Sequence, residues 1–344
     1  MLCALLLLVG CSKAATGSLR EDIVPQDSTR CRVVVSVPQA RTKATGVDQS
    51  GEQNVSGVQL LVYGEDGRME EYASGSGNMQ INLCKGNYEI YALVNAPNLS
   101  GAWTETALQG AYSFLSDNSV GRLVMAGSAS LSVTGDCDVT IDVTRLASKI
   151  VVDKITNGFA GSWLSGKTLT LNSLYVTNVC GSLRYDGAFA GTVWHNRMGY
   201  DAAESVYVKA LTFDSVNASI AQGSSHSTSH TFYCYANPST DTDTRGGTWS
   251  VRSTRLVLDV GIEDVTEHCY YVVDLPDISG NTIYRFSEIT LVNIGAEDEE
   301  SLADATALKF TVSVTGWESE SADLEMGLGS IVEPWDGEDS GEDV

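Results

Sequence analysis

Two histidines four positions apart, His226 and His230, are the residues of this chain whose type and spacing come closest to a metal site. When this spacing binds zinc, both imidazoles lie on one face of a helix and a glutamate follows the first histidine. Here Ser, Thr and Ser separate the two, and residues 222–229 have the composition of a polar loop. The pair therefore predicts a loop and no metal site.

Other patterns resemble catalytic or ligand-binding motifs but lack the residues that catalysis or ligand binding requires. The run from Asp241 begins like a calcium loop, but Arg245 and Arg252 occupy its fifth and twelfth positions, where oxygen ligands are required. Residues 75–77 lack the lysine of a phosphate-binding loop. Four histidines and no Gly-x-Ser-x-Gly motif give no sequence support for a hydrolytic triad. The sequence predicts a protein that is not an enzyme and carries no metal or cofactor.

One cysteine, Cys11, does stand in a motif that is chemically modified. It follows an apolar run, residues 2–9, which as a helix would rise about 12 Å, too little for the ~30 Å hydrocarbon core of a membrane. Such a run is typical of the core of a signal peptide. Residues 8–11, Leu-Val-Gly-Cys, resemble the bacterial lipobox, in which the cysteine thiol is acylated. We therefore predict a lipoprotein signal peptide over residues 1–11 and a palmitate-type lipid anchor on Cys11.

Charge and length narrow the class of protein further. The 344 residues include 21 Lys and Arg against 44 Asp and Glu, a net charge of −23. A nucleic-acid-binding surface needs clustered positive charge, so we predict no nucleic-acid partner. The length exceeds what one hydrophobic core usually serves, and it favours two domains.

The remaining cysteines are scattered and form no C-x-x-C pair, which argues against zinc ribbons and thioredoxin-like sites. In an exported protein a disulfide such as Cys84 to Cys137 is one interpretation, and buried free thiols are the other. The sequence does not choose, because six cysteines allow fifteen pairings. These six are Cys31, Cys84, Cys137, Cys180, Cys234 and Cys269.

The apolar residues alternate with polar ones from residue 32 onward, which indicates antiparallel strands with one buried and one exposed face. Clear examples are residues 139–144, 256–262 and 308–315. Turn residues separate the runs, helix is scarce, and residues 103–115 are the best candidate for one. The pattern predicts an all-β protein built of sandwiches.

A domain boundary is predicted near residues 144–148, because a complete set of strands precedes it and a new apolar run, residues 150–152, follows. No Pro- or Gly-rich linker separates the two parts, so we expect a direct, semi-rigid junction. The last twelve residues contain six acids, and residues 336–344 are expected to be a solvated tail.

Six segments, in order along nearly the whole chain, resemble landmarks of the fimbrillin family, the subunits of type V pili of Bacteroidia. The segments are residues 32–37 with the basic stretch 41–45, then 58–67, 86–95, 145–150, 232–238 and 281–285. The resemblance implies two tandem transthyretin-like Greek-key β-sandwich domains, residues 42–146 and 147–335. It also implies a structural subunit of a cell-surface fimbria that supports adhesion.

In that family a protease removes the leader together with the first strand, and the emptied groove accepts a strand from another subunit. Carried to this chain, the resemblance implies a propeptide of residues 12–41 and cleavage at Arg41 or Lys43. The displaced strand would present its apolar face through Val33, Val35 and Val37. A sandwich without that strand exposes unpaired backbone groups that another chain can satisfy.

The same alternation recurs near the C-terminus, and this predicts the donor strand. Its apolar residues are Leu324, Met326 and Leu328, followed by Ile331 and Val332. Because head-to-tail joints of this kind need not close into a ring, their repetition would give a filament.

The expected partners are other copies of the chain, related pilus subunits, a maturation protease, and a host glycan or protein ligand. The expected locations are the outer membrane, for the lipid-anchored precursor, and the extracellular fimbrium. Two alternatives stay open: an anchor or accessory subunit that keeps its lipid, and a surface glycan-binding lipoprotein. The tryptophans that could stack on sugars are Trp163, Trp194 and Trp249.

Overall fold

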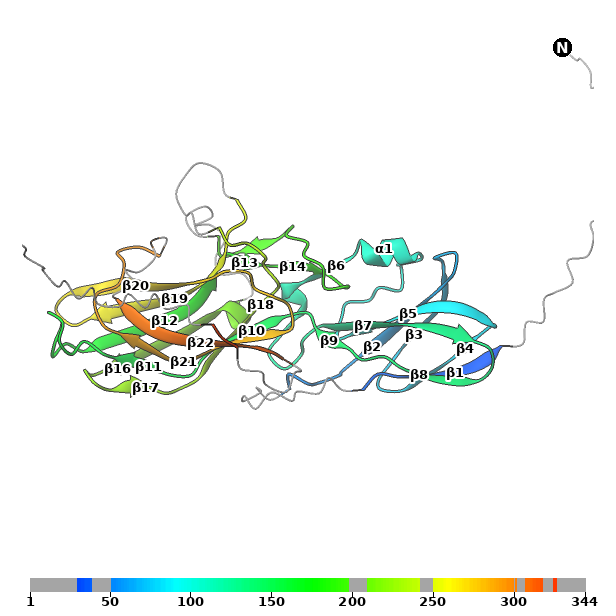
Figure 1. Cartoon of the computed structure of the whole chain (residues 1–344), viewed down its shortest axis with the longest axis horizontal. Helices are drawn as coiled ribbons and strands as arrows, with labels where there is room; N and C mark the ends of the chain where they lie inside the picture. Colours follow the sequence, from blue (N-terminus) through cyan, green and yellow to red (C-terminus); the bar gives the residue numbers. More distant parts are fainter. Residues whose placement is uncertain are drawn as a thin grey trace, which may run out of the picture.

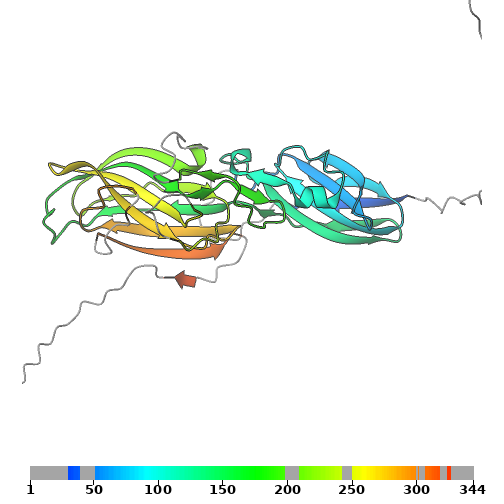
Figure 2. The same ribbon diagram turned by 90° about the horizontal axis from the view of Figure 1, so that it is seen from above.

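The computed structural model describes residues 30–38, 51–197, 209–241, 250–299, 301, 307–317 and the backbone of 324–326. These residues form strands almost throughout, in two groups that lie end to end along the long axis (Figures 1 and 2). We call the described residues up to Arg145 the N-terminal half and those from Ser148 onward the C-terminal half. The all-β sandwich class predicted from the sequence is confirmed, whereas the Greek-key connectivity stays a prediction.

The N-terminal half has one five-stranded and one three-stranded sheet. The larger has the order β3 (Met69–Gly75), β2 (Val58–Gly64), β5 (Gly86–Val94), β7 (Met125–Val133), β9 (Thr144–Arg145). The smaller has the order β4 (Met79–Leu83), β1 (Cys31–Ser36), β8 (Cys137–Thr140). Apolar side chains from both sheets, among them Val33, Leu60 and Ile90, form one buried cluster between them. Burial of such side chains is the main favourable contribution to folding of this half.

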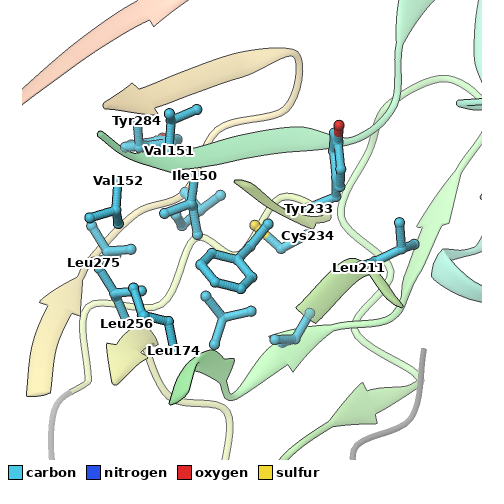
Figure 3. Packing of buried hydrophobic residues seen from close by; sticks show 14 of the residues in the cluster. Ile150, Val151, Val152, Leu174, Leu211, Tyr233, Cys234, Leu256, Leu275 and Tyr284 are labelled. Carbon is cyan, nitrogen blue, oxygen red and sulfur yellow. The ribbon is translucent and has the colours of Figure 1, made fainter. Parts of the chain in front are cut away.

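The C-terminal half also has two large sheets, besides the two-stranded β13–β15 sheet (Val179–Cys180 and Trp194–His195). One contains β17 (Ser225–His226), β11 (Ile155–Asn157), β21 (Thr282–Leu291), β10 (Ser148–Val152), β18 (His230–Cys234), β22 (Leu308–Gly316) and β23 (Leu324–Met326). The other has the order β16 (Phe213–Ile220), β12 (Leu169–Thr177), β19 (Thr254–Ile262), β20 (Thr266–Leu275). Figure 3 shows the core between them, where Ile150 and Val152 face Leu174, Leu256 and Leu275.

The two halves meet without a linker, since β9 ends at Arg145 and β10 begins at Ser148. Among the described residues, one strand pair crosses between them, β6 (Tyr112–Phe114) with β14 (Ser182–Arg184). Nearby lie β13 (Val179–Cys180), β15 (Trp194–His195) and the short helix α2 (Lys209–Thr212). The main apolar cluster runs across the junction and includes residues of both halves. The domain limits at residues 146 and 147 therefore stay a prediction.

The helix predicted over residues 103–115 is wrong in extent. Helix α1 covers only Glu105–Gln109, and Gly110 caps it. The chain then forms β6, and a 3₁₀ turn follows at Leu115–Asp117. A glycine weakens a helix, and pairing of β6 with the distant β14 favours the extended conformation there. Among the described residues, no helix is long and apolar enough to span a membrane.

The expectation that every strand has one exposed face is also wrong for the central strands. In β2, β10 and β19 nearly all residues are buried, so both faces are covered. Strands near the sheet edges, such as β8 and β16, keep the alternation of the sequence. Coverage of both faces explains why these strands contain adjacent apolar residues, such as Ile150, Val151 and Val152 in β10.

Candidate functional site

Strand β1 is the middle strand of its sheet, with a hydrogen-bonded neighbour on each side. It runs antiparallel to β4, where Val33 lies opposite Ile81, and parallel to β8, where Val33 lies opposite Cys137. β-Branched residues favour this extended conformation, and the segment supplies three consecutive valines. Beyond the strand, the Ile141 amide donates to the Ser36 carbonyl at 2.9 Å. Both backbone edges of β1 are therefore satisfied within the chain.

The apolar face of β1 is fully enclosed, as its alternation predicts. Val33 and Val35 are 0% exposed and Val37 is 3% exposed, all within the apolar cluster of the N-terminal half. Burial of one such side chain contributes about 1.5–3 kcal/mol as an upper range. Two ion pairs near the start of β1 are at the surface: Arg30 lies 3.8 Å from Glu71 and Arg32 lies 4.0 Å from Asp136. Such exposed pairs contribute little, so apolar burial and backbone pairing hold β1.

The position that β1 occupies is a site for one extended strand. Its walls are the backbone edges of β4 and β8, and its floor is the apolar cluster that Val33 and Val35 enter. An occupant needs free backbone groups on both edges and small or medium apolar side chains at every second position. We call this position the β1 groove.

The described residues of the segment predicted to be the donor strand do not pair with β4 or β8; they lie beside β22 in the C-terminal half. Strand β23, the short red arrow in Figure 2, pairs antiparallel with β22. Met326 lies opposite Val312 and Leu324 lies opposite Val314. It pairs over three residues and has β22 as its one neighbour among the described strands. β23 therefore has one paired edge where β1 has two. Leu328, Ile331 and Val332 lie outside the described residues, as do Cys11, Arg41 and Lys43.

Scans against known protein families and against curated proteins find no match. Solved structures do match. A candidate cell adhesion protein from Bacteroides eggerthii superposes with a TM-score of 0.61 at 16% identity, covering 84% of this chain and 96% of its own. A fimbrilin from Porphyromonas gingivalis gives a TM-score of 0.59 at 13% identity, covering 85% and 98%. This chain has the fimbrillin fold.

The fimbrillin fold thus extends over both halves of the chain and is not confined to one of them. A tip fimbrial protein from Porphyromonas gingivalis, in a C-terminally truncated form, shares it with a TM-score of 0.51 at 11% identity and covers 84% of this chain and 100% of its own. At these identities the likeness concerns architecture, and function has to be argued from the residues of this chain.

The histidine pair lies in the C-terminal half, far in sequence from the β1 groove. His226 ends β17 and His230 begins β18, with their Nε2 atoms 3.1 Å apart, and His230 Nδ1 lies 2.7 Å from an Asp214 carboxylate oxygen. Burial, followed by the neighbouring His230, lowers the pKa of His226. No group of three or more potential metal ligands occurs within the described residues. The histidines satisfy each other's hydrogen bonds across a short loop.

Of the tryptophans considered for sugar stacking, the two described ones differ in exposure. Trp194 is 7% exposed and packs in the core, whereas Trp163 is 65% exposed, and Trp249 lies outside the described residues. A hollow of about 1010 Å³ lies over β12, β19 and the β19–β20 turn. Its described lining is polar and includes no Trp, Tyr or Phe. This arrangement does not favour a glycan site.

No disulfide joins any two of the six described cysteines. Burial raises the pKa of Cys180 to about 11 and that of Cys234 to about 12.

We expect a maleimide at pH 7 to modify the exposed Cys84 rapidly. It should modify Cys180 and Cys234 about a hundredfold more slowly, because these buried thiols react only after local opening of the fold. Peptide mass spectrometry after timed quenching measures this. A Cys84 that stays unlabelled would favour the disulfide, and equal rates at Cys84 and Cys234 would contradict the buried thiols.

Sequence reasoning missed one group at the junction, formed around the buried carboxylate of Glu52. The signal that was available is Lys149, a charged residue inside β10, whose other residues are all buried. A lysine is almost never buried without a partner, so its position implied a buried counter-charge.

Proposed function

We propose that this protein is a structural subunit of a cell-surface fimbria that supports adhesion and polymerises by protease-triggered strand exchange. The observation that carries the proposal is β1, an apolar strand paired on both edges and followed in the sequence by the basic residues Arg41 and Lys43. Its removal would leave β4 and β8 with unpaired backbone groups and would expose the apolar floor of the β1 groove. Such a state is unfavourable until another strand enters.

The C-terminal segment is the proposed occupant of the β1 groove in the next subunit. β23 is held along a single edge over three residues, so its release breaks few backbone hydrogen bonds. The apolar alternation of Leu324, Met326 and Leu328 matches that of Val33, Val35 and Val37. Such a joint is heterologous, because one subunit supplies the donor strand and the next subunit supplies the β1 groove. Repetition of the joint extends a filament of this chain and related subunits.

The proposed life cycle begins with a precursor anchored in the outer membrane through lipid on Cys11 and ends in the extracellular fimbrium. A maturation protease acts between the two stages, at Arg41 or Lys43. A host glycan or protein would be the adhesion ligand. The role is structural, with no catalytic step.

Limited trypsin treatment of the soluble precursor is expected to give a main species that begins at Thr42 or Ala44. The reason is that the segment after β1 is polar and basic, whereas exposed basic residues elsewhere, such as Arg32 in β1 and Arg68, have hydrogen-bonded backbone that a protease cannot easily take up. Intact-mass measurement and N-terminal sequencing identify the species.

Electron microscopy of the trypsin-treated protein supplies the functional half of this test, with untreated precursor as control. We expect filaments after treatment and none before. Filaments from untreated precursor, or a folded product that keeps residues 33–37 covalently attached, would contradict the proposal.

A further inference from the structure

A group of five charged and aromatic side chains is buried where the two halves meet. Its members are Glu52 before β2, Arg145 in β9, Lys149 in β10, Tyr233 in β18 and Trp317 directly after β22. Each is at most 2% exposed. We call these residues the Glu52 cluster. They come from four stretches of the chain, around residues 52, 145–149, 233 and 317, so the cluster joins segments that are far apart in the sequence.

Glu52 is bound through all of its oxygen atoms. Lys149 Nζ lies 2.8 Å from one carboxylate oxygen, and the Tyr233 hydroxyl donates a hydrogen bond to the other. Arg145 Nε donates to the Glu52 backbone carbonyl at 3.2 Å. A buried charge that loses such partners is strongly destabilising, because neither water nor another charge replaces them.

Trp317 is the aromatic surface on which the same cations rest. The Arg145 guanidinium carbon lies 4.7 Å and Lys149 Nζ 5.4 Å from the centroid of the indole ring. The Tyr233 ring stacks on the indole with centroids 6.3 Å apart and planes inclined by 19°. Cation–π attraction is strongest when both groups are desolvated, as here. Trp317 directly follows β22 and precedes the C-terminal segment that contains β23.

The residues that flank Glu52 are bound to the N-terminal half instead. Asn54 Nδ2 donates to the Gly121 carbonyl at 3.3 Å, and the Ser56 hydroxyl donates to Asn95 Oδ1 at 2.7 Å. Gly51 has φ of +96°, and a Cβ there would lie 2.9 Å from the Gly121 Cα, so only glycine fits. Residues 51–56 therefore contact both halves of the molecule.

We propose that the Glu52 cluster is a clamp that holds together the segment following the cleavage sites, the junction between the halves, and the base of the C-terminal segment. Glu52 is its positioning residue. The inference rests on the proposed function only for the meaning of the cleavage sites and of the C-terminal segment. If the proposed function holds, cleavage at Arg41 or Lys43 removes β1 and leaves Glu52 in the chain. The clamp then fixes the position of Trp317, the residue that precedes the donor segment.

The clamp is tested on the uncut chain with a glutamyl endopeptidase, which cuts after accessible glutamates. Glu52 in the native protein should resist cleavage under conditions in which the exposed Glu65 is cut. Lys149→Met keeps the side-chain length and removes the charge, and Tyr233→Phe removes one hydroxyl. Both should raise the rate of cleavage after Glu52 about tenfold or more, since cleavage follows the population of the open form.

Lys154→Met is the matched control, because Lys154 also lies 2.8 Å from a glutamate, Glu288, but in a pair whose side chains are 39% and 38% exposed. It should leave cleavage at Glu52 unchanged. Cleavage at Glu89, inside β5, reports global unfolding. If the Lys149→Met variant is cut at Glu89, it is unfolded, and the result of the Tyr233→Phe variant then decides whether the clamp exists. Native Glu52 cut as fast as Glu65, or a folded variant with Glu52 still resistant, would overturn the clamp.

Hydrogen exchange on the same proteins tests the coupling that defines a clamp. In the Tyr233→Phe variant, exchange should rise together in residues 51–56 and in residues 314–317, while β1 keeps its native protection. A rise in one segment alone would overturn the proposal. These measurements involve no filament, so the clamp and the proposed function can fail independently.

Discussion

A chain that ends at residue 321 is expected to fold and to be secreted but to form no filaments after protease treatment. It keeps β1 in its own groove, so both sheets of the N-terminal half stay complete. It loses β23, whose pairing with β22 covers three residues at the edge of the sheet, so the C-terminal half keeps its core. The donor segment is absent, and an emptied groove has nothing to fill it. Electron microscopy and unboiled denaturing gels measure the loss.

Two further variants separate the donor strand from the tail that follows it. A chain truncated from Asp336 onward should still polymerise, because that tail is acidic and is expected to remain in water. The double substitution Met326→Asp with Leu328→Asp should abolish polymerisation, since each unpaired carboxylate would have to enter the apolar floor of the groove. Filaments formed by the chain that ends at residue 321 would disprove the assignment of the donor strand.

Replacing Val35 with Asp is expected to lower the free energy of unfolding of the precursor by about 3–5 kcal/mol. Val35 is 0% exposed and packs in an apolar cluster that offers no partner for a carboxylate. The N-terminal half depends on β1 for the middle of one sheet, so the loss should appear there first. Urea unfolding followed by circular dichroism gives the free energy, and hydrogen exchange locates it.

Arg32→Ala is the control for this substitution, on the same strand and three positions before Val35. The Arg32 side chain is 55% exposed and its contact with Asp136 is 4.0 Å long. We expect a change within about 0.5 kcal/mol. Equal stability of the Val35→Asp and Arg32→Ala precursors would contradict the enclosed site.

The buried face of β1 could be predicted from the sequence because it depends on alternation alone, and Val33, Val35 and Val37 alternate without interruption. The neighbours of β1 could not. That β1 lies between β4 and the parallel β8 is a result of pairings 44 to 104 residues apart, which no local pattern reports. The same reason explains the error over residues 103–115, where β6 pairs with a strand about 70 residues further on.

The Glu52 cluster lay beyond sequence reasoning for a related reason. Glu52 stands among polar residues and has no local mark of burial, and its partners Lys149 and Tyr233 are 97 and 181 residues away. Only tertiary packing brings them together. Lys149 did carry a signal, since a charge within an apolar strand requires a partner, but the sequence could not say which carboxylate would supply it.

The mixed surroundings of β1 bear on the polarity of a filament. A strand in the β1 groove meets one antiparallel neighbour, β4, and one parallel neighbour, β8. If it enters in the reverse direction, the two relationships exchange, and the occupant still has one neighbour of each kind. The hydrogen-bonding edges therefore distinguish head from tail only weakly. The direction in which a strand binds must therefore depend on the order and size of the side chains that pack into the apolar floor of the β1 groove. The polarity of a filament would then be set by side chains and not by backbone hydrogen bonds.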